Sequence, residues 1–264
     1  MFITIITDCK DDNAKGRQTS RCAALMGVTP SFLGIDGGFT EAGELECAGN
    51  LIDILDATEK QKGIIIANVA PRGGTGKKYA NGTPFGWFNY GETIVLASIE
   101  GKVLSLVKSL GVADKLNVFD IPTVMRLAVE NNWLDEITSK RIINTQFRSF
   151  DFLPRAAAWL VQGSAIPTEV VEINESIKNG YVWKVDNFGN AKTTLLESDI
   201  LDGVLKTQWG NLKFYPRLKD VPEGERAAII GSSGIAEKRF VEIVAQGKSA
   251  ARELGINQGD MVLL

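Results

Sequence analysis

The sequence predicts an α/β N-terminal domain with a largely parallel sheet, followed by a smaller all-β, barrel-like C-terminal domain. In the first half, short apolar runs alternate with helical patterns, which is typical of parallel α/β sheets. After Gln162 the apolar runs become shorter and are separated by Gly and Pro, which favours a small β-domain. We therefore divide the chain into residues 1–162, a connection over 163–178, and residues 179–264.

The first domain begins with a buried strand, Phe2–Thr7, that opens into a polar turn. The continuous Ile-rich run Gly63–Val69 is typical of a strand covered on both faces. Further extended segments are expected over 31–36, 93–97 and 116–119, and helical segments over 14–26, 44–56, 102–110, 123–137 and 155–161. In the second domain, strands are expected over 181–185, 191–195, 227–230 and 240–245.

Composition excludes several classes of protein. The chain contains no histidine, so Ser-His and Cys-His nucleophiles and His-containing metal sites are excluded. Cys9, Cys22 and Cys47 are odd in number and have no CxxC spacing, which favours reduced thiols in the cytoplasm over a disulfide framework or a zinc site. With 29 basic and 32 acidic residues, the net charge of −3 argues against nucleic acid as a partner.

No apolar stretch approaches the roughly 20 residues that cross a bilayer, so no membrane partner is expected. The N-terminal segment MFITIITDCKDD lacks the basic start and the long apolar run of a signal peptide. These observations predict a soluble cytoplasmic protein.

Acidic side chains follow the first predicted strand directly. Asp8, Asp11 and Asp12 stand where this strand meets the next helix. Ligands of open α/β sheets bind beyond the carboxyl ends of strands, where a carboxylate can accept hydrogen bonds from both hydroxyls of a ribose. The alternative is that these acids only begin the helix, whose dipole favours negative charge. Position alone leaves both interpretations open.

A glycine-rich loop, Pro71-Arg72-Gly73-Gly74-Thr75-Gly76-Lys77-Lys78, follows the Ile-rich strand. It is not a nucleotide phosphate loop, because Pro71 replaces the first glycine and Lys78 stands where Ser or Thr would bind magnesium. Glycines at a strand end still allow a ligand to approach the backbone closely. A ligand loop and a simple turn both remain open.

Two turns of the second domain carry polar groups. Asp186-Asn187-Phe188-Gly189-Asn190 consists of good turn residues, yet it also offers a carboxylate, an aromatic face and an amide. Gly231-Ser232-Ser233-Gly234 is not a nucleophile elbow, because Ile235 replaces the last glycine of GxSxG and no histidine can activate the serine. Its hydroxyls and backbone N–H groups could bind a carboxylate, and its alternative is again a plain turn.

Taken in order, these segments resemble the family of S-adenosylmethionine (SAM) hydroxide adenosyltransferases, which also contains SAM-dependent fluorinases and chlorinases. The resemblance runs over nearly the whole chain. It is carried by Ile6-Thr7-Asp8, Gly34-Ile35-Asp36, the glycine-rich loop, Asp186-Asn187-Phe188-Gly189-Asn190, Ile230-Gly231-Ser232-Ser233-Gly234, Val241-Glu242-Ile243-Val244, Ser249-Ala250-Ala251 and Gly259-Asp260. It implies an α/β domain, a β-barrel domain, and a homotrimer with SAM between neighbouring subunits.

The resemblance also implies roles for single residues in holding SAM or adenosine. Asp8 would hold the ribose hydroxyls, Phe188 would stack on adenine, and Asn190 would hydrogen-bond the adenine edge. No metal and no cofactor beyond SAM itself, as substrate or ligand, is implied.

The methionine part of SAM would be held by the second domain. Asp186 would take the amine, while Ser232 and Ser233 would hold the polar end of the amino acid. Because the sulfonium leaves without a base, displacement at C5′ mainly needs a positioned and desolvated nucleophile. Such an enzyme needs no histidine.

The chain departs from the family where water is activated. Hydroxide-using members carry Asp and Arg in an Asp-Pro-Gly-Val-Gly-Thr-x-Arg loop and His in a Phe-His-Gly-Arg-Asp segment. Here the corresponding residues are Ala70, Lys77 and Arg148. Ser149 stands where the fluorinase has its halide-binding serine. We therefore expect Lys77, Arg148 and Ser149 to replace the usual catalytic trio, with the two cations stabilising an anion.

Two further segments depart from the family pattern. The turn that contacts adenosine through Asn in relatives is Ser98-Ile99-Glu100-Gly101 here. The segment Tyr79–Tyr90 is long and aromatic, and either forms one wall of the site or packs at a subunit contact.

Three functions therefore remain open. The first is hydrolysis of SAM at C5′ to adenosine and L-methionine. The second is a non-catalytic protein that binds SAM or adenosine. The third is an enzyme that uses a halide as nucleophile.

Overall fold

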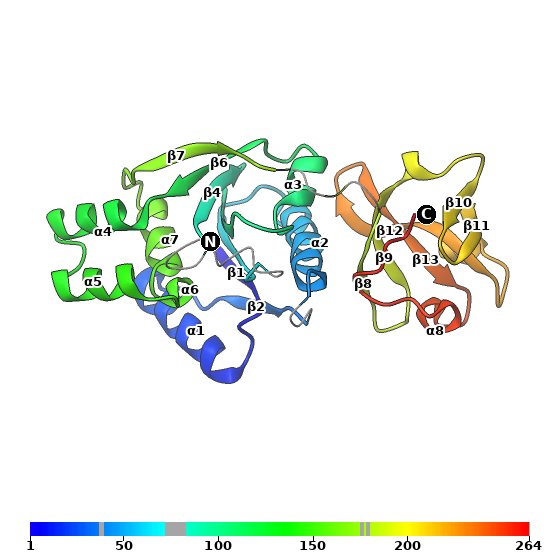
Figure 1. Ribbon diagram of the computed structural model, residues 1–264, viewed down its shortest axis with the longest axis horizontal. Coiled ribbons are helices and arrows are strands. Elements are labelled where there is room, and N and C mark those ends of the chain that lie inside the picture. The colour runs from blue at the N-terminus through cyan, green and yellow to red at the C-terminus, as the bar shows by residue number, and fades with distance from the viewer. Residues whose placement is uncertain (37–39, 72–82, 175–176, 178–179, 264) are drawn as a thin grey trace.

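A computed structural model describes residues 1–36, 40–71, 83–174, 177 and 180–263. Figure 1 shows two domains side by side, each built around its own sheet. The first domain combines a sheet with helices, and the second is a β-sheet domain with one short helix. The fold class predicted from the sequence is confirmed.

The sheet of the first domain has the strand order β2-β1-β3-β5-β4-β6-β7. The strands β2, β1, β3 and β5 are parallel, and the other three add antiparallel pairs. Their bounds are β1 Phe2–Thr7, β2 Ser31–Gly34, β3 Gly63–Asn68, β4 Phe85–Tyr90, β5 Thr93–Ser98, β6 Lys115–Phe119 and β7 Thr168–Glu172. The sheet is therefore mixed, with its parallel part at the N-terminal strands.

Two strands lie in segments for which the sequence predicted none. The aromatic segment 79–90 contains β4, whose Phe85 and Phe88 are buried in the two cores of the domain. The segment 163–178 contains β7, which pairs with β6 at the edge of the sheet. Because an edge strand is mostly exposed, β7 has no core periodicity that a sequence pattern could reveal.

Helices cover both faces of this sheet. Their bounds are α1 Asp12–Met26, α2 Ala42–Ala57, α3 Ser105–Ser109, α4 Ile121–Glu130, α5 Glu136–Asn144, α6 Arg148–Asp151 and α7 Leu153–Val161. Neighbouring residues of β1 point to opposite faces, so Ile5 packs in the core beneath α1, α4 and α7, and Ile6 in the core beneath α2 and α3. Figure 1 shows α1, α6 and α7 on one side of the sheet and α2 on the other.

The single helix expected over 123–137 is in fact two helices, α4 and α5. Asn132 interrupts the helical path with a positive φ of 58°, a conformation that Asn tolerates better than most residues. Asp135 then caps α5 by accepting a hydrogen bond from the backbone N–H of Thr138 at 2.8 Å. The apolar spacing runs through this break, which is why periodicity alone did not reveal it.

The second domain has the strand order β10-β11-β12-β13-β9-β8. Its elements are β8 Val182–Val185, β9 Ala191–Leu196, β10 Val204–Thr207, β11 Gly210–Tyr215, β12 Arg226–Ile235, β13 Lys238–Ala245, α8 Ala250–Leu254 and two 3-10 turns, Glu197–Asp199 and Leu218–Asp220. The hairpin β10–β11 was not predicted. The curved sheet encloses a core that includes Val182, Leu205 and Val241.

Helix α2 joins the two domains. A Cβ on Gly49 of this helix would lie 2.2 Å from the ring of Trp183, so only glycine lets the indole pack against the helix. At the last turn of α2, Asp56 forms an ion pair with Arg239 of β13 at 2.8 Å. The second domain is therefore fixed to the face of the sheet that α2 covers, away from α1 and α6.

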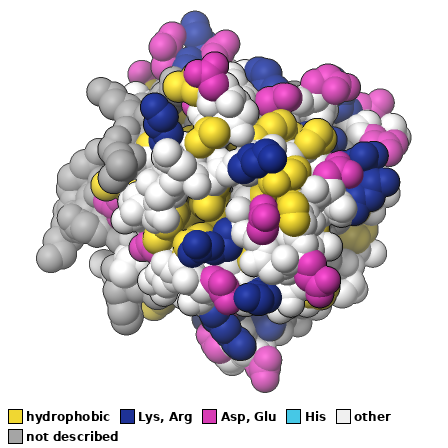
Figure 2. All heavy atoms as spheres, turned by 90° about the vertical axis from the view of Figure 1, so that its right-hand side faces the viewer, with side chains coloured by type: hydrophobic (Ala, Val, Ile, Leu, Met, Phe, Trp, Pro, Cys, Tyr) yellow, Lys and Arg dark blue, Asp and Glu magenta, His cyan; other side chains and the backbone are white. Residues whose placement is uncertain are grey.

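The surface of the second domain carries charges of both signs. Figure 2 views the end of the molecule formed by this domain, and basic and acidic side chains are interspersed there with apolar ones. This mixture agrees with the nearly balanced composition of the chain. In the part of the chain that the structure describes, no helix has the length and apolar character needed to cross a membrane.

Candidate active site

Asp8 lies at the carboxyl end of β1, where it meets the end of β3. Its Oδ2 accepts a hydrogen bond from the backbone N–H of Ala70 at 3.2 Å. This contact arises because β1 and β3 are neighbouring parallel strands, so the residues that follow them lie at the same edge. Asp11, by contrast, caps α1 by accepting from the N–H of Ala14 at 3.0 Å. The two interpretations of the acidic cluster therefore apply to different residues. Asp11 begins the helix, and Asp8 contacts the residues that follow β3.

The turn between β8 and β9 is organised around the carboxylate of Asp186. Its Oδ1 accepts from the backbone N–H groups of Phe188 and Asn190, both at 2.9 Å. Its Oδ2 accepts from the side-chain amide of Asn190 at 3.1 Å. These bonds hold Asp186 and Asn190 against each other while Phe188 projects outward with 73% of its surface exposed. An aromatic ring on a tightly held turn is available for stacking on another ring.

Gly189 is required for the shape of this turn. Its φ of +84° lies in the left-handed region, and a Cβ there would also come within 2.0 Å of the Ser249 hydroxyl. The absence of that Cβ lets the Gly189 carbonyl accept from the N–H of Ala251 in α8 at 2.9 Å. A cavity of about 340 Å³ lies between the turn and α8, with Arg252 on its wall.

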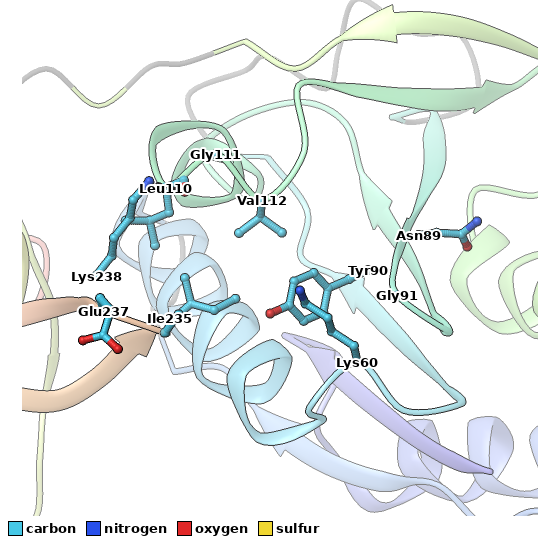
Figure 3. A pocket seen from close by; sticks show the side chains of 11 residues that line it. Lys60, Asn89, Tyr90, Gly91, Leu110, Gly111, Val112, Ile235, Glu237 and Lys238 are labelled. Carbon is cyan, nitrogen blue, oxygen red and sulfur yellow. Dashed lines mark hydrogen bonds between the residues drawn. The ribbon is translucent and has the colours of Figure 1, made fainter.

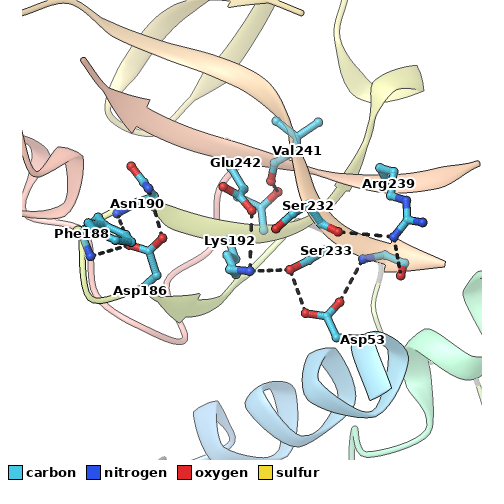
Figure 4. A network of polar contacts seen from close by, with 12 residues as sticks. Asp53, Asp186, Phe188, Asn190, Lys192, Ser232, Ser233, Arg239, Val241 and Glu242 are labelled. Atoms are coloured by element: carbon cyan, nitrogen blue, oxygen red, sulfur yellow. Dashed lines mark hydrogen bonds and ion pairs between the residues drawn. The ribbon is translucent and has the colours of Figure 1, made fainter. Parts of the chain in front are cut away.

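Ser232 and Ser233 lie on β12 with opposite exposure. Ser232 is exposed, while Ser233 is only 2% exposed and lies at the contact with α2. The Ser233 hydroxyl accepts from Lys192 Nζ at 2.6 Å and donates to Asp53 of α2 at 2.8 Å (Figure 4). The binding roles predicted for both serines stay predictions. In this structure Ser233 connects the two domains.

Glu242 completes this cluster on β13, and we call Asp53, Lys192, Ser233 and Glu242 the interdomain cluster. Lys192 Nζ lies 3.8 Å from Glu242 Oε1. Burial raises the pKa of Glu242, and Lys192 partly opposes the shift. Burial likewise raises the pKa of Asp53, against the hydrogen bonds that it accepts from Gly234 and Ser233. A buried carboxylate, Glu242, and a half-buried one, Asp53, therefore share one lysine.

The proposed catalytic residues Arg148 and Ser149 begin the short helix α6. Both are nearly buried, with 9% and 8% of their surfaces exposed. Helix α6 packs against α1 and α7, on the opposite face of the sheet from α2. Lys77, the third residue of the predicted trio, lies outside the described residues, as does most of the glycine-rich loop. Their catalytic roles stay predictions.

Within one chain these residues form two groups rather than one site. Asp8 and α6 belong to the first domain, while the Asp186 turn, Ser232 and Ser233 belong to the second. The second domain contacts the first through α2, and α6 lies across the sheet from that contact.

A larger cavity lies between the domains, at the ends of the strands opposite to the end where Asp8 lies. Its volume is about 500 Å³, and Lys60, Tyr90 and Lys238 are among the residues that line it (Figure 3). Lys60 and Tyr90 precede β3 and β5, so the cavity lies at the amino ends of these parallel strands. Asp8 and Ala70 follow carboxyl ends, so this cavity is separate from the edge that carries Asp8.

Sequence reasoning missed Asp53 and Lys192. The sequence pattern predicted only that Asp53 lies in an amphipathic helix and that Lys192 lies in a strand, and it assigned no further role to either residue. A signal for the cluster does exist: Glu242 interrupts the apolar run Phe240–Ala245, and an acid inside a buried strand requires a partner. The sequence does not show which residues supply it, because the partners come from β9, β12 and α2.

Comparison with known proteins gives a family match for the second domain and a similar fold for the whole chain. The family described as the SAM hydroxide adenosyltransferase C-terminal domain matches residues 180–263. A structure of an uncharacterized conserved protein from Thermotoga maritima is similar at a TM-score of 0.68 and 16% identity, over 99% of both chains. A conserved hypothetical protein from Thermus thermophilus is similar at a TM-score of 0.61 and 17% identity, over 100% of this chain and 99% of the other. A search of the curated proteins gave no match.

The two structural neighbours show that the two-domain fold extends over the whole chain. The matched residues include the Asp186 turn and both serines, so this part of the chain is similar to the C-terminal domain of SAM hydroxide adenosyltransferases.

Proposed function

We propose that the protein binds SAM between neighbouring copies of the chain and cleaves it at C5′, giving adenosine and L-methionine. The observation that carries the proposal is the Asp186 turn, which presents an exposed Phe188 within the domain that the family model matches. Phe188 stacks on adenine, and Asn190 hydrogen-bonds the adenine edge. Asp186, with Ser232 and Ser233, holds the methionine end.

The other half of the site comes from the first domain of the neighbouring copy. Asp8 at the carboxyl end of β1 holds the ribose hydroxyls, since ligands of such sheets bind beyond that end. The separation of the two groups within one chain supports a site at a subunit contact, and we propose a homotrimer. Head-to-tail contacts of this kind close into rings, which a trimer satisfies.

The reaction is a displacement in which water attacks C5′. A C5′–O bond forms, the C5′–S bond breaks with its electron pair going to sulfur, and the water loses a proton to solvent. The neutral thioether leaves without protonation, so the protein mainly positions and desolvates the nucleophile. The proton leaves before the attack, and Arg148 and Ser149, with Lys77, stabilise the resulting hydroxide.

A time course of the purified protein with SAM, resolved by liquid chromatography, tests this function. We expect adenosine and L-methionine above the rate without protein, and neither above that rate with Asp8→Ala. A chlorinated nucleoside formed only with chloride would move the nucleophile to halide. SAM that binds and stays unchanged would contradict catalysis.

The second candidate is a protein that binds SAM or adenosine without cleaving it. It is favoured by the replacement of the family's water-activating Asp and His with Ala70 and Arg148. The same time course separates the two, because a binding protein retains SAM for hours without releasing adenosine.

A further inference from the structure

Arg148 is a buried cation with no counterion among the described residues. Only 9% of its surface is exposed, and its Nε has no hydrogen-bond partner there. In the described part of the chain, its guanidinium donates one long hydrogen bond, to the Ile143 carbonyl at 3.5 Å, and forms no ion pair. The segment 72–82, which lies outside the described residues, contains no Asp or Glu in its sequence. Burial lowers the pKa of Arg148, but a guanidinium stays protonated in proteins.

The nearest carboxylate along the chain, Asp151, is already shared by other arginines. Its Oδ2 lies 2.7 Å from Arg141 and its Oδ1 lies 3.2 Å from Arg21. The Asp151 carbonyl accepts from Arg155 at 2.6 Å. We call Arg21, Arg141, Arg148, Asp151 and Arg155 the α6 arginine cluster. It holds four guanidinium groups and one carboxylate.

A buried charge with no partner is costly, and breaking a buried ion pair destabilises a protein for the same reason. An anion from outside the chain would complete the pair and remove this cost. Within the described residues, Arg21 NH1 of the same cluster is also buried without a hydrogen-bond partner. Among the described residues the cluster thus has two guanidinium groups with spare donors and one spare acceptor, Asp151 Oδ1, which is 3.2 Å from Arg21.

The cluster lies near the edge of the sheet that carries Asp8. Arg17, in the second turn of α1, lies with its guanidinium 4.5 Å from the centre of the Phe150 ring in α6. Because α1 begins at Asp12, just after β1, this contact holds α6 beside the first turns of the helix that follows Asp8. The hydroxyl of Ser149 follows Arg148 directly and adds a further donor.

We propose that Arg148 and Ser149 bind the oxyanion of a second ligand, a carboxylate or a phosphate, next to the nucleoside site. A planar guanidinium donates two parallel hydrogen bonds to such a group, whereas a spherical halide cannot accept in that geometry. The position beside SAM rests on the proposed function. The binding of the oxyanion does not.

The proposal also removes an electrostatic conflict. A guanidinium beside a sulfonium weakens SAM binding, and an oxyanion on Arg148 cancels that repulsion. SAM and the oxyanion should therefore bind with positive coupling, each tightening the other by the same factor.

Thermal unfolding without SAM tests the oxyanion site. Inorganic phosphate, acetate and chloride are compared at one ionic strength, on the wild-type protein, Arg148→Gln and the exposed control Arg126→Gln. We expect phosphate or acetate to raise the Tm of the wild type and of R126Q by about 3–5 °C at ten times the dissociation constant, relative to chloride. Whichever of the two acts more strongly identifies the ligand as a phosphate or a carboxylate. R148Q should lose this rise, yet unfold in chloride no lower than the wild type, because a buried unpaired charge has been removed.

An equal effect of chloride and both oxyanions, or a rise that persists in R148Q, would overturn the proposal. A large drop in the Tm of R148Q in chloride would do so as well, because it would make Arg148 structural. If R148Q does not fold, Arg148→Lys takes its place, since it keeps the charge and loses the planar fork. The difference in Tm between oxyanion and chloride should then be much smaller for Arg148→Lys than for the wild type.

Equilibrium binding of SAM with and without phosphate or acetate tests the coupling. The effective oxyanion should tighten SAM binding in the wild type and leave it unchanged in R148Q. Oxyanion binding without any SAM binding would contradict the proposed function and leave the oxyanion site standing. SAM cleavage without oxyanion binding would contradict the oxyanion site and leave the proposed function standing.

Discussion

The interdomain cluster and the α6 arginine cluster differ in whether their charges are paired. In the interdomain cluster, Lys192 lies between Ser233 and Glu242, and Ser233 passes a hydrogen bond on to Asp53. In the α6 arginine cluster, Asp151 pairs with Arg21 and Arg141, while Arg148 has no acidic partner among the described residues. The first cluster pairs Lys192 with Glu242 and holds two domains together, although Glu242 Oε1 accepts no hydrogen bond among the described residues. The second has spare donors, which is the condition of a group that meets a ligand.

The largest expected effect follows from Lys192→Met, which breaks the paired cluster. It leaves the buried Glu242 and the half-buried Asp53 without their cation, so the free energy of unfolding should fall by about 3 kcal/mol. Chemical denaturation measures this loss, with the exposed Lys206→Met of β10 as the matched control. Equal stability of the two variants would mean that the cluster contributes nothing, and the contrast with Arg148 would disappear.

Asp8→Asn separates ligand binding from folding. The carboxylate accepts from both ribose hydroxyls in the proposed complex, so SAM binding should weaken about 100-fold while the Tm changes little. Calorimetric titration with SAM measures the affinity. Asp12→Asn, in the first turn of α1, is the control and should bind SAM normally; the idea fails if both variants weaken binding equally.

Phe188→Ala tests whether an exposed side chain contributes to SAM binding rather than to stability. Because the ring is exposed, its loss should change the free energy of unfolding by less than about 0.5 kcal/mol. Losing a stacked aromatic should nevertheless weaken SAM binding about tenfold. Leu201→Ala, another exposed apolar residue of the second domain, should change neither quantity. Unaltered affinity for SAM in the Phe188 variant would remove stacking from the account.

The smallest expected effect is a pH dependence of the interdomain cluster. Burial holds the pKa of Glu242 above its ordinary value of 4.5, so the folded protein binds this proton more tightly than the unfolded chain. The resulting stability is fully present below pH 4.5 and is lost as the pH rises through the raised pKa. Compared with Glu242→Gln, the wild type should therefore lose stability over that range. Parallel curves for the two proteins would show that Glu242 does not titrate differently in the folded state.

The sequence predicted those parts of the fold that follow from local pattern. The Ile-rich run Gly63–Val69 was recognised as a buried strand because both of its faces are covered. The edge strand β7 and the hairpin β10–β11 were missed because half-exposed strands show little apolar contrast. The break at Asn132 was missed for another reason, since apolar spacing continues across it.

The candidate site was predictable as a set of residues but not as an arrangement. The turn Asp186–Asn190 could be recognised because its own residues make its hydrogen bonds. The link from Ser233 to Asp53 joins residues 180 positions apart, so only the folded chain reveals it. The isolation of Arg148 is likewise a property of packing, because the carboxylate three residues away is held by arginines of other helices.

Mixing two inactive variants tests most directly whether the site is shared between copies. Asp8→Ala removes the ribose contact of the first domain, and Phe188→Arg places a cation where adenine stacks in the second. If each site joins the first domain of one copy to the second domain of the next, equal co-expression should leave about a quarter of the contacts with both halves intact. We predict adenosine formation from SAM at about that fraction of the wild-type rate. A mixture that assembles but forms no adenosine would contradict the shared site.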